Sequence, residues 1–186
     1  MKKVTYWLLS LVLCMGFTAA KAQTGNNAQP SNGQQRSQDR ITREVHHELV
    51  MLPQLTIFDN LQYQVNGNEV TLKGEVVHGV LKGEAQDAVK KIEGVEKVNN
   101  QIDILPPSPM DNRIRLAVAH ALFGNDSPLF RYAMGALPPI HIIVKSGHVT
   151  LEGVVDSESD KNLAYTKANG VPGVFSVTNN LVVQKS

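Results

Sequence analysis

The sequence predicts an α+β protein made of two tandem αββαβ modules, each a three-stranded sheet packed against two helices. The motif V-T-L-x-G-x-V stands at residues 70–76 and again, 79 residues later, at 149–155. Around both motifs the hydrophobic pattern runs in the same order, from helical to alternating, alternating, helical and alternating. Self-similarity at one fixed offset indicates an internal duplication.

The duplication extends over residues 65–104 without a gap. The identical pairs are Val65/Val144, Val70/Val149, Thr71/Thr150, Leu72/Leu151, Gly74/Gly153, Val76/Val155, Lys82/Lys161, Ala85/Ala164, Gly94/Gly173, Val95/Val174, Val98/Val177 and Asn100/Asn179. Because most of these are apolar or glycine, the pattern describes a shared core and shared turns.

Residues 1–22 have the features of a secretory signal peptide. Two lysines precede a short apolar run, and an A-x-A site ends at Ala22, after which we expect cleavage. An uncleaved anchor is the alternative, although the run is short for a membrane span. Lipidation at Cys14 is disfavoured by the bulky Leu13 before it. Cys14 is the only cysteine, so an exported mature chain would have no disulfide and no thiol chemistry.

Charge argues against a nucleic-acid-binding protein. The chain has 18 Lys and Arg against 17 Asp and Glu, and cleavage would remove three lysines. The mature net charge would then be −2, whereas nucleic-acid-binding domains are usually distinctly basic.

Composition divides the rest of the chain into four parts. Residues 23–39 are polar and rich in Gln, Asn and Gly, so we expect a flexible linker. The first module covers 40–105, three prolines make 106–110 a semi-rigid linker, and the second module covers 111–184.

A helix is expected to open each module, and a hairpin follows it. Apolar residues recur at helical spacing, and Asp111 and Asn112 are candidate caps of the second such helix. These residues are Ile41, Val45, Leu49 and Leu52, and Ile114, Val118, Ala121 and Leu122. Asn66-Gly67 predicts a tight turn with two positive φ angles, and Ser146-Gly147 takes the same place in the second copy. Glycines 74 and 153 on the returning strands suggest close packing of a helix.

A second helix and a third strand complete each module. The first copy has an apolar helical stripe at residues 81–92, and its counterpart spans 157–169; Gly94 and Gly173 are expected as C-caps. The last strands present Asn100 and Asn179 on their apolar faces. We interpret both as buried amides that bind backbone groups, with ligand contact as the alternative. The pattern does not fix the strand order.

This arrangement resembles the BON domain. The resemblance rests on V-T-L-x-G-x-V before the second helix and on G-V-x-x-V-x-N-x-[IL] after it, at 94–102 and 173–181. It covers nearly all of the chain from Arg40 onward. Proteins of this family are envelope and osmotic-stress proteins, often with paired modules behind a signal peptide.

The resemblance implies a function in binding. We expect a non-enzymatic, exported protein of the periplasm, secreted or membrane-associated in the alternative, which supports the envelope under stress and needs no cofactor. Its expected partners are the surface of an anionic phospholipid membrane or other envelope proteins. The motif residues themselves are structural, so they predict the fold better than the ligand.

Lysines near the second helix of each copy are the candidate lipid-binding residues. A basic helix edge beside an aromatic residue can lie on an anionic membrane, although a solvated helix face has the same pattern. The candidates are Lys82, Lys90, Lys91, Lys97, Lys161, Tyr165 and Lys167.

An apolar insertion in the second module is the candidate partner-binding segment. The distance from the first helix to the first strand is six residues longer than in the first copy, and residues 124–137 are unusually apolar for a loop. The segment would bind a lipid interface or a partner, or would fold back over the gap between the modules, which we favour because exposed apolar patches are rare. Its candidate contacts are Leu129, Phe130, Tyr132 and Met134.

No catalytic or metal-binding pattern stands out. His46 and His47 lie beside Glu44 and Glu48, but neighbouring helical residues point about 100° apart. His141 and His148 are expected to face each other across the second hairpin, where two ligands alone would be too few for zinc. We therefore expect no metal site.

Overall fold

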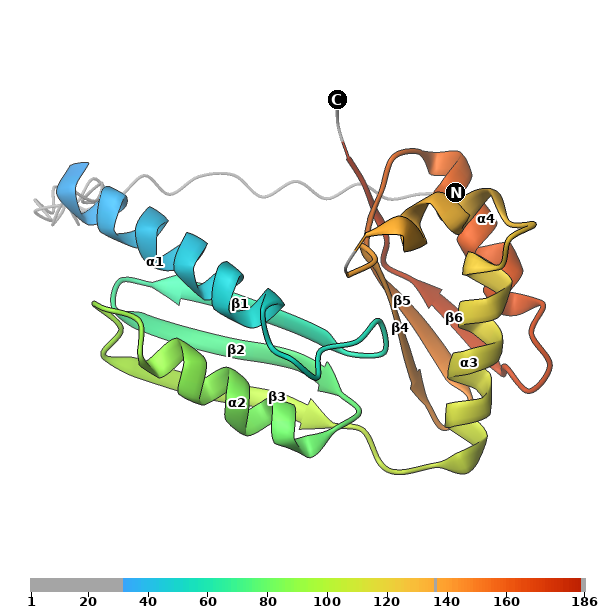
Figure 1. The fold of residues 1–186 in the computed structure, drawn as a ribbon, viewed down its shortest axis with the longest axis horizontal. Helices are drawn as coiled ribbons and strands as arrows, with labels where there is room; N and C mark the ends of the chain where they lie inside the picture. The colour runs from blue at the N-terminus through green and yellow to red at the C-terminus, as the bar shows by residue number, and fades with distance from the viewer. Residues whose placement is uncertain (1–31, 136, 185–186) are drawn as a thin grey trace, which may run out of the picture.

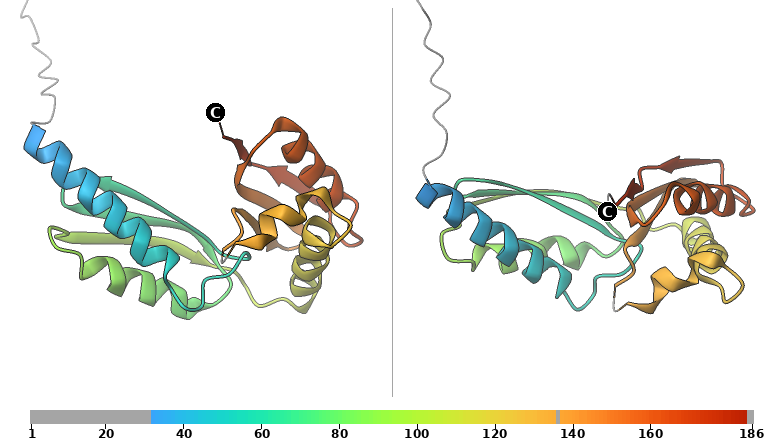
Figure 2. Two further views of the ribbon diagram at one scale, coloured as in Figure 1. Left: turned by 45° about the horizontal axis from the view of Figure 1, so that its top comes forward. Right: turned by 90° about the horizontal axis from the view of Figure 1, so that it is seen from above.

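The computed structural model describes residues 32–135 and 137–184, which form two modules joined in line (Figure 1). In each module the helices cover one face of a twisted sheet, as the two further views also show (Figure 2). The α+β class and the tandem arrangement are confirmed. The predicted signal peptide and residues 23–31 of the predicted linker lie outside the described residues.

The first module has the predicted order of elements. It comprises α1 (Asn32–Val50), β1 (Asn60–Asn66), β2 (Glu69–Val76), α2 (Gly79–Lys90) and β3 (Lys97–Ile104). The sheet order is β1-β2-β3. The hairpin β1–β2 is antiparallel, whereas β2 and β3 are parallel, because α2 carries the chain back across the sheet.

The second module repeats this order with two changes. It comprises α3 (Pro109–Phe123), the 3₁₀ helix η1 (Pro128–Met134), β4 (Ile140–Lys145), β5 (His148–Val155), α4 (Glu158–Asn169), β6 (Ser176–Asn179) and β7 (Val182–Val183). The added η1 occupies the insertion. The expected third strand is divided into β6 and β7, both of which pair in parallel with β5.

Two helices begin earlier than predicted. α1 starts at Asn32, so residues 32–39 are helical and the prediction of a flexible linker is wrong there. Adding residues to an existing helix is cheap, and Gln and Arg are good helix formers. α3 starts at Pro109 inside the predicted proline-rich linker. Its N-cap is Ser108, whose hydroxyl accepts the Asp111 N–H at 3.2 Å, and not Asp111 or Asn112.

The two hairpin turns differ in detail. In the first, the turn residues are Gly67 and Asn68, one position later than predicted, and only Gly67 has a positive φ. In the second, Ser146 and Gly147 have φ angles of 54° and 78°. The buried Asp111 carboxylate accepts both turn amides, at 2.9 Å from Ser146 N and 2.8 Å from Gly147 N. These two bonds hold a serine in a conformation that favours glycine.

The backbone of the neighbouring strand or of the residue before it, and not a helix, packs closely against Gly74 and Gly153. A Cβ on Gly74 would lie 1.9 Å from the carbonyl oxygen of Asn60, and one on Gly153 would lie 1.9 Å from that of Pro139. Their φ angles are 111° and 118°, a region closed to most side chains. The expectation of helix packing is thus wrong.

The glycines that follow the second helices are not the C-caps either. The caps are Lys91 and Gly170, and residues 94 and 173 take positive φ in the next turn. Each glycine lies three residues after the C-cap, in the turn that leads into the third strand.

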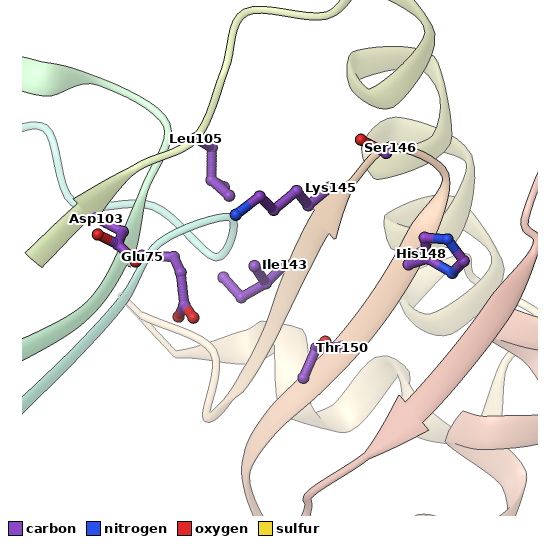
Figure 3. A pocket seen from close by; sticks show the side chains of 8 residues that line it. All are labelled: Glu75, Asp103, Leu105, Ile143, Lys145, Ser146, His148 and Thr150. Carbon is purple, nitrogen blue, oxygen red and sulfur yellow. The ribbon is translucent and has the colours of Figure 1, made fainter.

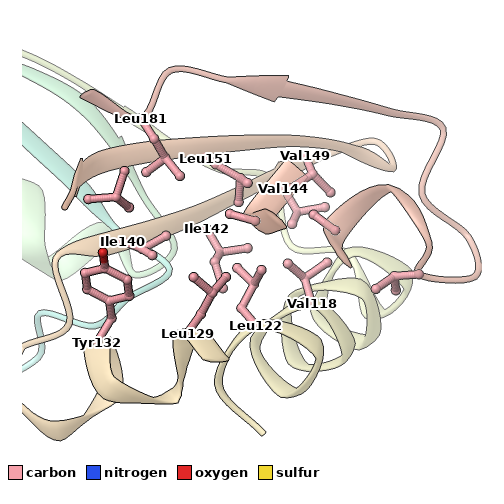
Figure 4. Close-up of a cluster of buried hydrophobic side chains, with 14 of the residues drawn as sticks. Val118, Leu122, Leu129, Tyr132, Ile140, Ile142, Val144, Val149, Leu151 and Leu181 are labelled. Carbon is pink, nitrogen blue, oxygen red and sulfur yellow. The ribbon is translucent and has the colours of Figure 1, made fainter. Parts of the chain in front are cut away.

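Each module has its own core, but one loop of the first enters the second. The second core is built mainly by α3, α4, η1 and the inner face of β4 and β5 (Figure 4). Ile57 and Phe58, between α1 and β1, pack against this core and not against their own. Ile142 N on the edge strand β4 also donates to Ile57 O at 2.7 Å. The modules are therefore joined by packing and by backbone pairing as well as by the linker.

Candidate functional site

The lysines shared by the two copies lie at the start of α2 and α4. The Lys82 ammonium donates to Ile102 O on β3 at 2.7 Å, and its side chain is half-buried. Lys161 is half-buried at the matching place on α4. This hydrogen bond of Lys82 has a structural effect, since it ties α2 to the edge strand β3 of the sheet.

The other lysines of the first module gather at the opposite end of α2. Lys90 and Lys91 end the helix, and Lys97 begins β3. Both lysines at the helix end are exposed, and Lys97 forms an ion pair with Glu69 at 2.8 Å. Lys91 lines a hollow together with Glu44, His47, Glu48 and Glu93. Carboxylates thus surround part of the basic cluster that the sequence predicts.

The candidates of the second module lie on α4. Tyr165 is exposed, whereas Lys161 and Lys167 are half-buried. Figures 1 and 2 show α2 and α4 in separate parts of the molecule, so the structure does not unite the seven candidates in one surface. A flat membrane would meet two separate basic edges.

The apolar insertion folds onto its own module. Leu129 is 0% exposed and Tyr132 is 8% exposed, and both belong to the second core (Figure 4). The prediction that they contact a partner is wrong, because the 3₁₀ helix turns them inward. Phe130, at 38%, and Met134, at 74%, remain exposed.

The sequence analysis favoured an insertion that folds back over the gap between the modules, and only the end of the insertion does so. Leu137 lines a hollow of about 130 Å³ together with residues of α1 and β1 of the first module. Leu129 and Tyr132 pack on the core of their own module. The insertion therefore both extends the second core and borders the junction.

A polar cluster fixes the insertion in place. The Asp160 carboxylate accepts hydrogen bonds from Arg131 at 2.6 Å, from Ser157 Oγ at 2.7 Å and from Tyr132 Oη at 3.0 Å. Burial opposes ionisation of Asp160, but the hydrogen bonds from Ser157, Arg131 and Tyr132 outweigh it and hold its pKa below the ordinary value. Burial raises the pKa of Tyr132, which therefore stays a neutral donor.

The histidines do not assemble into a metal site. His141 lies opposite Glu152 and His148 lies opposite Lys145, so the expectation that the two histidines face each other is wrong. In the part of the chain that the structure describes, no group of three or more His, Cys, Asp or Glu side chains could hold a metal ion. The ring of His46 lies 6.4 Å from that of Tyr63.

His141 instead lies at the junction of the modules. Burial lowers its pKa below the ordinary value, while a hydrogen bond to the backbone of Asp59 and the charge of Asp59 act in the opposite direction. The Asp59 carboxylate is fully buried and accepts Val77 N at 2.7 Å. Both groups fix the loop that enters the second module.

Sequence reasoning missed a cleft between the modules (Figure 3). It has a volume of about 420 Å³. Its lining residues are Glu75, Asp103, Leu105, Ile143, Lys145, Ser146, His148 and Thr150. Glu75 and Thr150 stand within the repeated motif, but the motif does not predict the cleft, because its walls come together only through the placement of one module against the other.

Burial raises the pKa of Glu75 above its ordinary value. The negative charges of Glu152 and Asp103 act in the same direction, whereas a hydrogen bond from Asn60 and the charge of Lys145 lower it. The first module's wall of the cleft carries two acidic side chains, Glu75 and Asp103.

Across the described residues, we find no helix whose length and apolar character would let it cross a membrane.

Similar proteins were found by sequence and by structure. Osmotically-inducible protein Y of Escherichia coli (strain K12) is 25% identical over 195 residues, covering 96% of both chains. Two solved structures of CdsD, a structural protein of the type III secretion system of Chlamydia trachomatis, are 12% identical. They cover 77% and 79% of this chain and 96% and 93% of theirs, with TM-scores of 0.31 and 0.32.

The repeated motifs coincide with a known family. The family profile described as BON domain matches residues 37–106 and again residues 111–185. These two ranges contain both αββαβ modules except the first residues of α1 and α3, and four residues lie between them. This chain belongs to the BON domain family.

Proposed function

We propose that this protein is a non-enzymatic, exported envelope protein that acts under osmotic stress by binding anionic phospholipid surfaces. The proposal is supported by the paired BON domains and by similarity to an osmotically-inducible protein along nearly the full chain. The predicted signal peptide supports export to the periplasm. The observation that carries the binding is the exposure of cationic side chains at the end of α2.

Lys90 and Lys91 are the first-choice contacts. Both are exposed at the C-terminal end of α2. A lysine near an anionic membrane contributes on the order of 1 kcal/mol, and salt screens this attraction. Lys167 and Tyr165 on α4 form a second, weaker contact. Lys82 and Lys97 contribute less, because their ammonium groups already bind Ile102 O and Glu69.

Vesicle sedimentation tests the proposal. The mature protein should sediment with phosphatidylglycerol-containing vesicles and not with phosphatidylcholine vesicles, and raising the salt from about 0.05 M to about 0.5 M should release it. The double variant Lys90→Gln/Lys91→Gln should bind several-fold less. Lys73→Gln, an exposed lysine on β2, is the matched control. Equal binding to both vesicle types would refute the proposal.

Export is tested separately. Mass spectrometry of the protein from the periplasmic fraction should give an N-terminus at Gln23. An N-terminus at Met1 would contradict cleavage after Ala22.

A second candidate function is that of a periplasmic adaptor acting through residues 124–137. Only Phe130 and Met134 support it, because both are exposed while their neighbours Leu129 and Tyr132 are core residues. Photo-crosslinking from position 134 in intact cells tests it. A crosslinked protein that disappears with Phe130→Ser would support the adaptor function, and crosslinks to lipid alone would exclude it.

A further inference from the structure

Acidic side chains of the first module and a lysine of the second line opposite walls of the cleft between the modules. Glu75 on β2 and Asp103 on β3 are register partners, and both side chains line the wall that the first module provides. Lys145 and His148 are register partners at the end of the second hairpin and lie on the other wall. Like groups directly opposed on neighbouring strands destabilise a sheet. The carboxylate pair is therefore unfavourable unless a cation compensates it.

The protein does not fully compensate these charges itself. No ion pair within 4.0 Å joins Glu75, Asp103 or Lys145 to any partner in residues 32–135 and 137–184. Figure 3 shows the Lys145 side chain extending toward the first module and ending beside Leu105. Both walls thus hold charged groups that remain available to a ligand.

The floor of the cleft is apolar and firmly placed. Leu105 is 3% exposed and Ile143 is 5% exposed, and both line the cleft. The insertion of Ile57 and Phe58 into the second core, together with the bond from Ile142 N to Ile57 O, holds the two walls in place. The cleft is therefore preformed, which lowers the cost of binding.

The charges of the cleft are not part of the duplicated pattern. Seventy-nine residues from Glu75 stands Val154, and the same offset takes Asp103 to Val182 and Lys145 to Asn66. Val154 and Val182 are exposed on the outside of the second module. Each of these charged groups therefore occurs in one copy only, and the shared fold does not require it.

We propose that this cleft binds a small zwitterion of the amino-acid or short-peptide class. Its ammonium group lies between Glu75 and Asp103, its carboxylate pairs with Lys145, and its carbon chain rests on Leu105 and Ile143. The cleft of about 420 Å³ is large enough for such a molecule. Ser146 and Thr150 add hydroxyl groups at the rim. This site is separate from the lipid-binding lysines and does not depend on the proposed function.

The charges of the ligand follow from the charges of the walls. A simple cation would pair with the carboxylates but would be repelled by Lys145. A simple anion would pair with Lys145 but would be repelled by the carboxylates. Only a molecule with both charges pairs with both walls at once, and charge-assisted contacts are stronger than neutral ones.

NMR titration of the ¹⁵N-labelled mature protein tests the proposal. The probe is aminohexanoate with its amino group on the terminal carbon, and the comparison compounds are hexylamine and hexanoate. We expect saturable shifts of the amides at positions 75, 103, 105 and 145 with aminohexanoate, and binding roughly tenfold weaker for each comparison compound. Hexylamine or hexanoate binding as tightly as aminohexanoate would overturn the proposal, as would an absence of saturable shifts at these amides.

Charge-removing variants locate the two contacts. Glu75→Gln and Lys145→Gln should each weaken aminohexanoate binding roughly tenfold. Lys73→Gln and Asp87→Asn, which remove exposed charges outside the cleft, should leave it unchanged. If Lys145→Gln bound hexylamine no better than the wild type does, the carboxylate contact would be wrong. The backbone amide spectrum of each variant serves as the check on folding.

Discussion

The side-chain amide of Asn100 donates a hydrogen bond to Lys82 O at 2.7 Å, and Asn179 donates the same bond to Lys161 O at 2.8 Å. The oxygen of each amide accepts the backbone N–H two residues later, at 3.2 Å from Ile102 and 3.3 Å from Leu181. In the first module the Lys82 ammonium binds Ile102 O as well. β3 is an edge strand of its sheet. Side chains therefore occupy backbone groups that another strand could otherwise pair with.

Replacing Asn100 with alanine should destabilise the protein by about 1 to 3 kcal/mol, because the Ile102 N–H loses its acceptor and the bond that ties β3 to Lys82 O is removed. Urea unfolding measures this change. Asn68→Ala is the matched control, since Asn68 makes an exposed side-chain bond to Glu96 and should cost far less. Equal losses in the two variants would contradict a structural role for the shared amide.

Gly74→Ala and Gly83→Ala should change stability in opposite directions. A Cβ at Gly74 collides with the Asn60 carbonyl at a φ of +111°, so this variant should be strongly destabilised or fail to fold. Gly83 lies within α2 with open space around it, and alanine there should stabilise by about 0.5 to 1 kcal/mol. Thermal unfolding distinguishes the two, and a stable Gly74→Ala protein would show that the strands had shifted.

Stability should fall in acid through Asp160. Its pKa in the folded protein lies below the ordinary value near 3.8, so its contribution is complete above that value and disappears as the pH falls through the lower, folded pKa. The free energy of unfolding of the wild type and of Asp160→Asn, measured from about pH 2 to pH 6, checks this. The difference between them should shrink toward acid and stay constant at higher pH. A difference that grows toward acid would have the wrong sign.

Phe58→Ala should destabilise the second module although Phe58 precedes the first strand of the first. Its ring packs against the second core, so truncation should cost about 1 to 3 kcal/mol there. Hydrogen exchange at the Leu151 amide in β5 should quicken accordingly. Val80→Ala, at an exposed position of α2, is the control. Unchanged protection at Leu151 would mean that the modules are stabilised independently.

Patterns in the amino-acid sequence predicted the two modules, their element order and the residues of their cores. Helical and alternating patterns identified the elements, because periodicity records which face of each element is buried. The sequence also predicted Asn100 and Asn179 as amides that bind backbone groups. The pattern could not give the start of α1, because a solvated helical turn has no buried face to mark it.

Features that depend on contacts between distant segments became visible only in the folded protein. The tertiary structure turned Leu129 and Tyr132 into core residues, since burial of an insertion depends on the surface beneath it. It tied Lys82 to Ile102 and placed Glu75 across from Lys145 in one cleft. Local periodicity reports on a residue's own element, whereas a binding surface is formed by elements that meet only after the chain has folded.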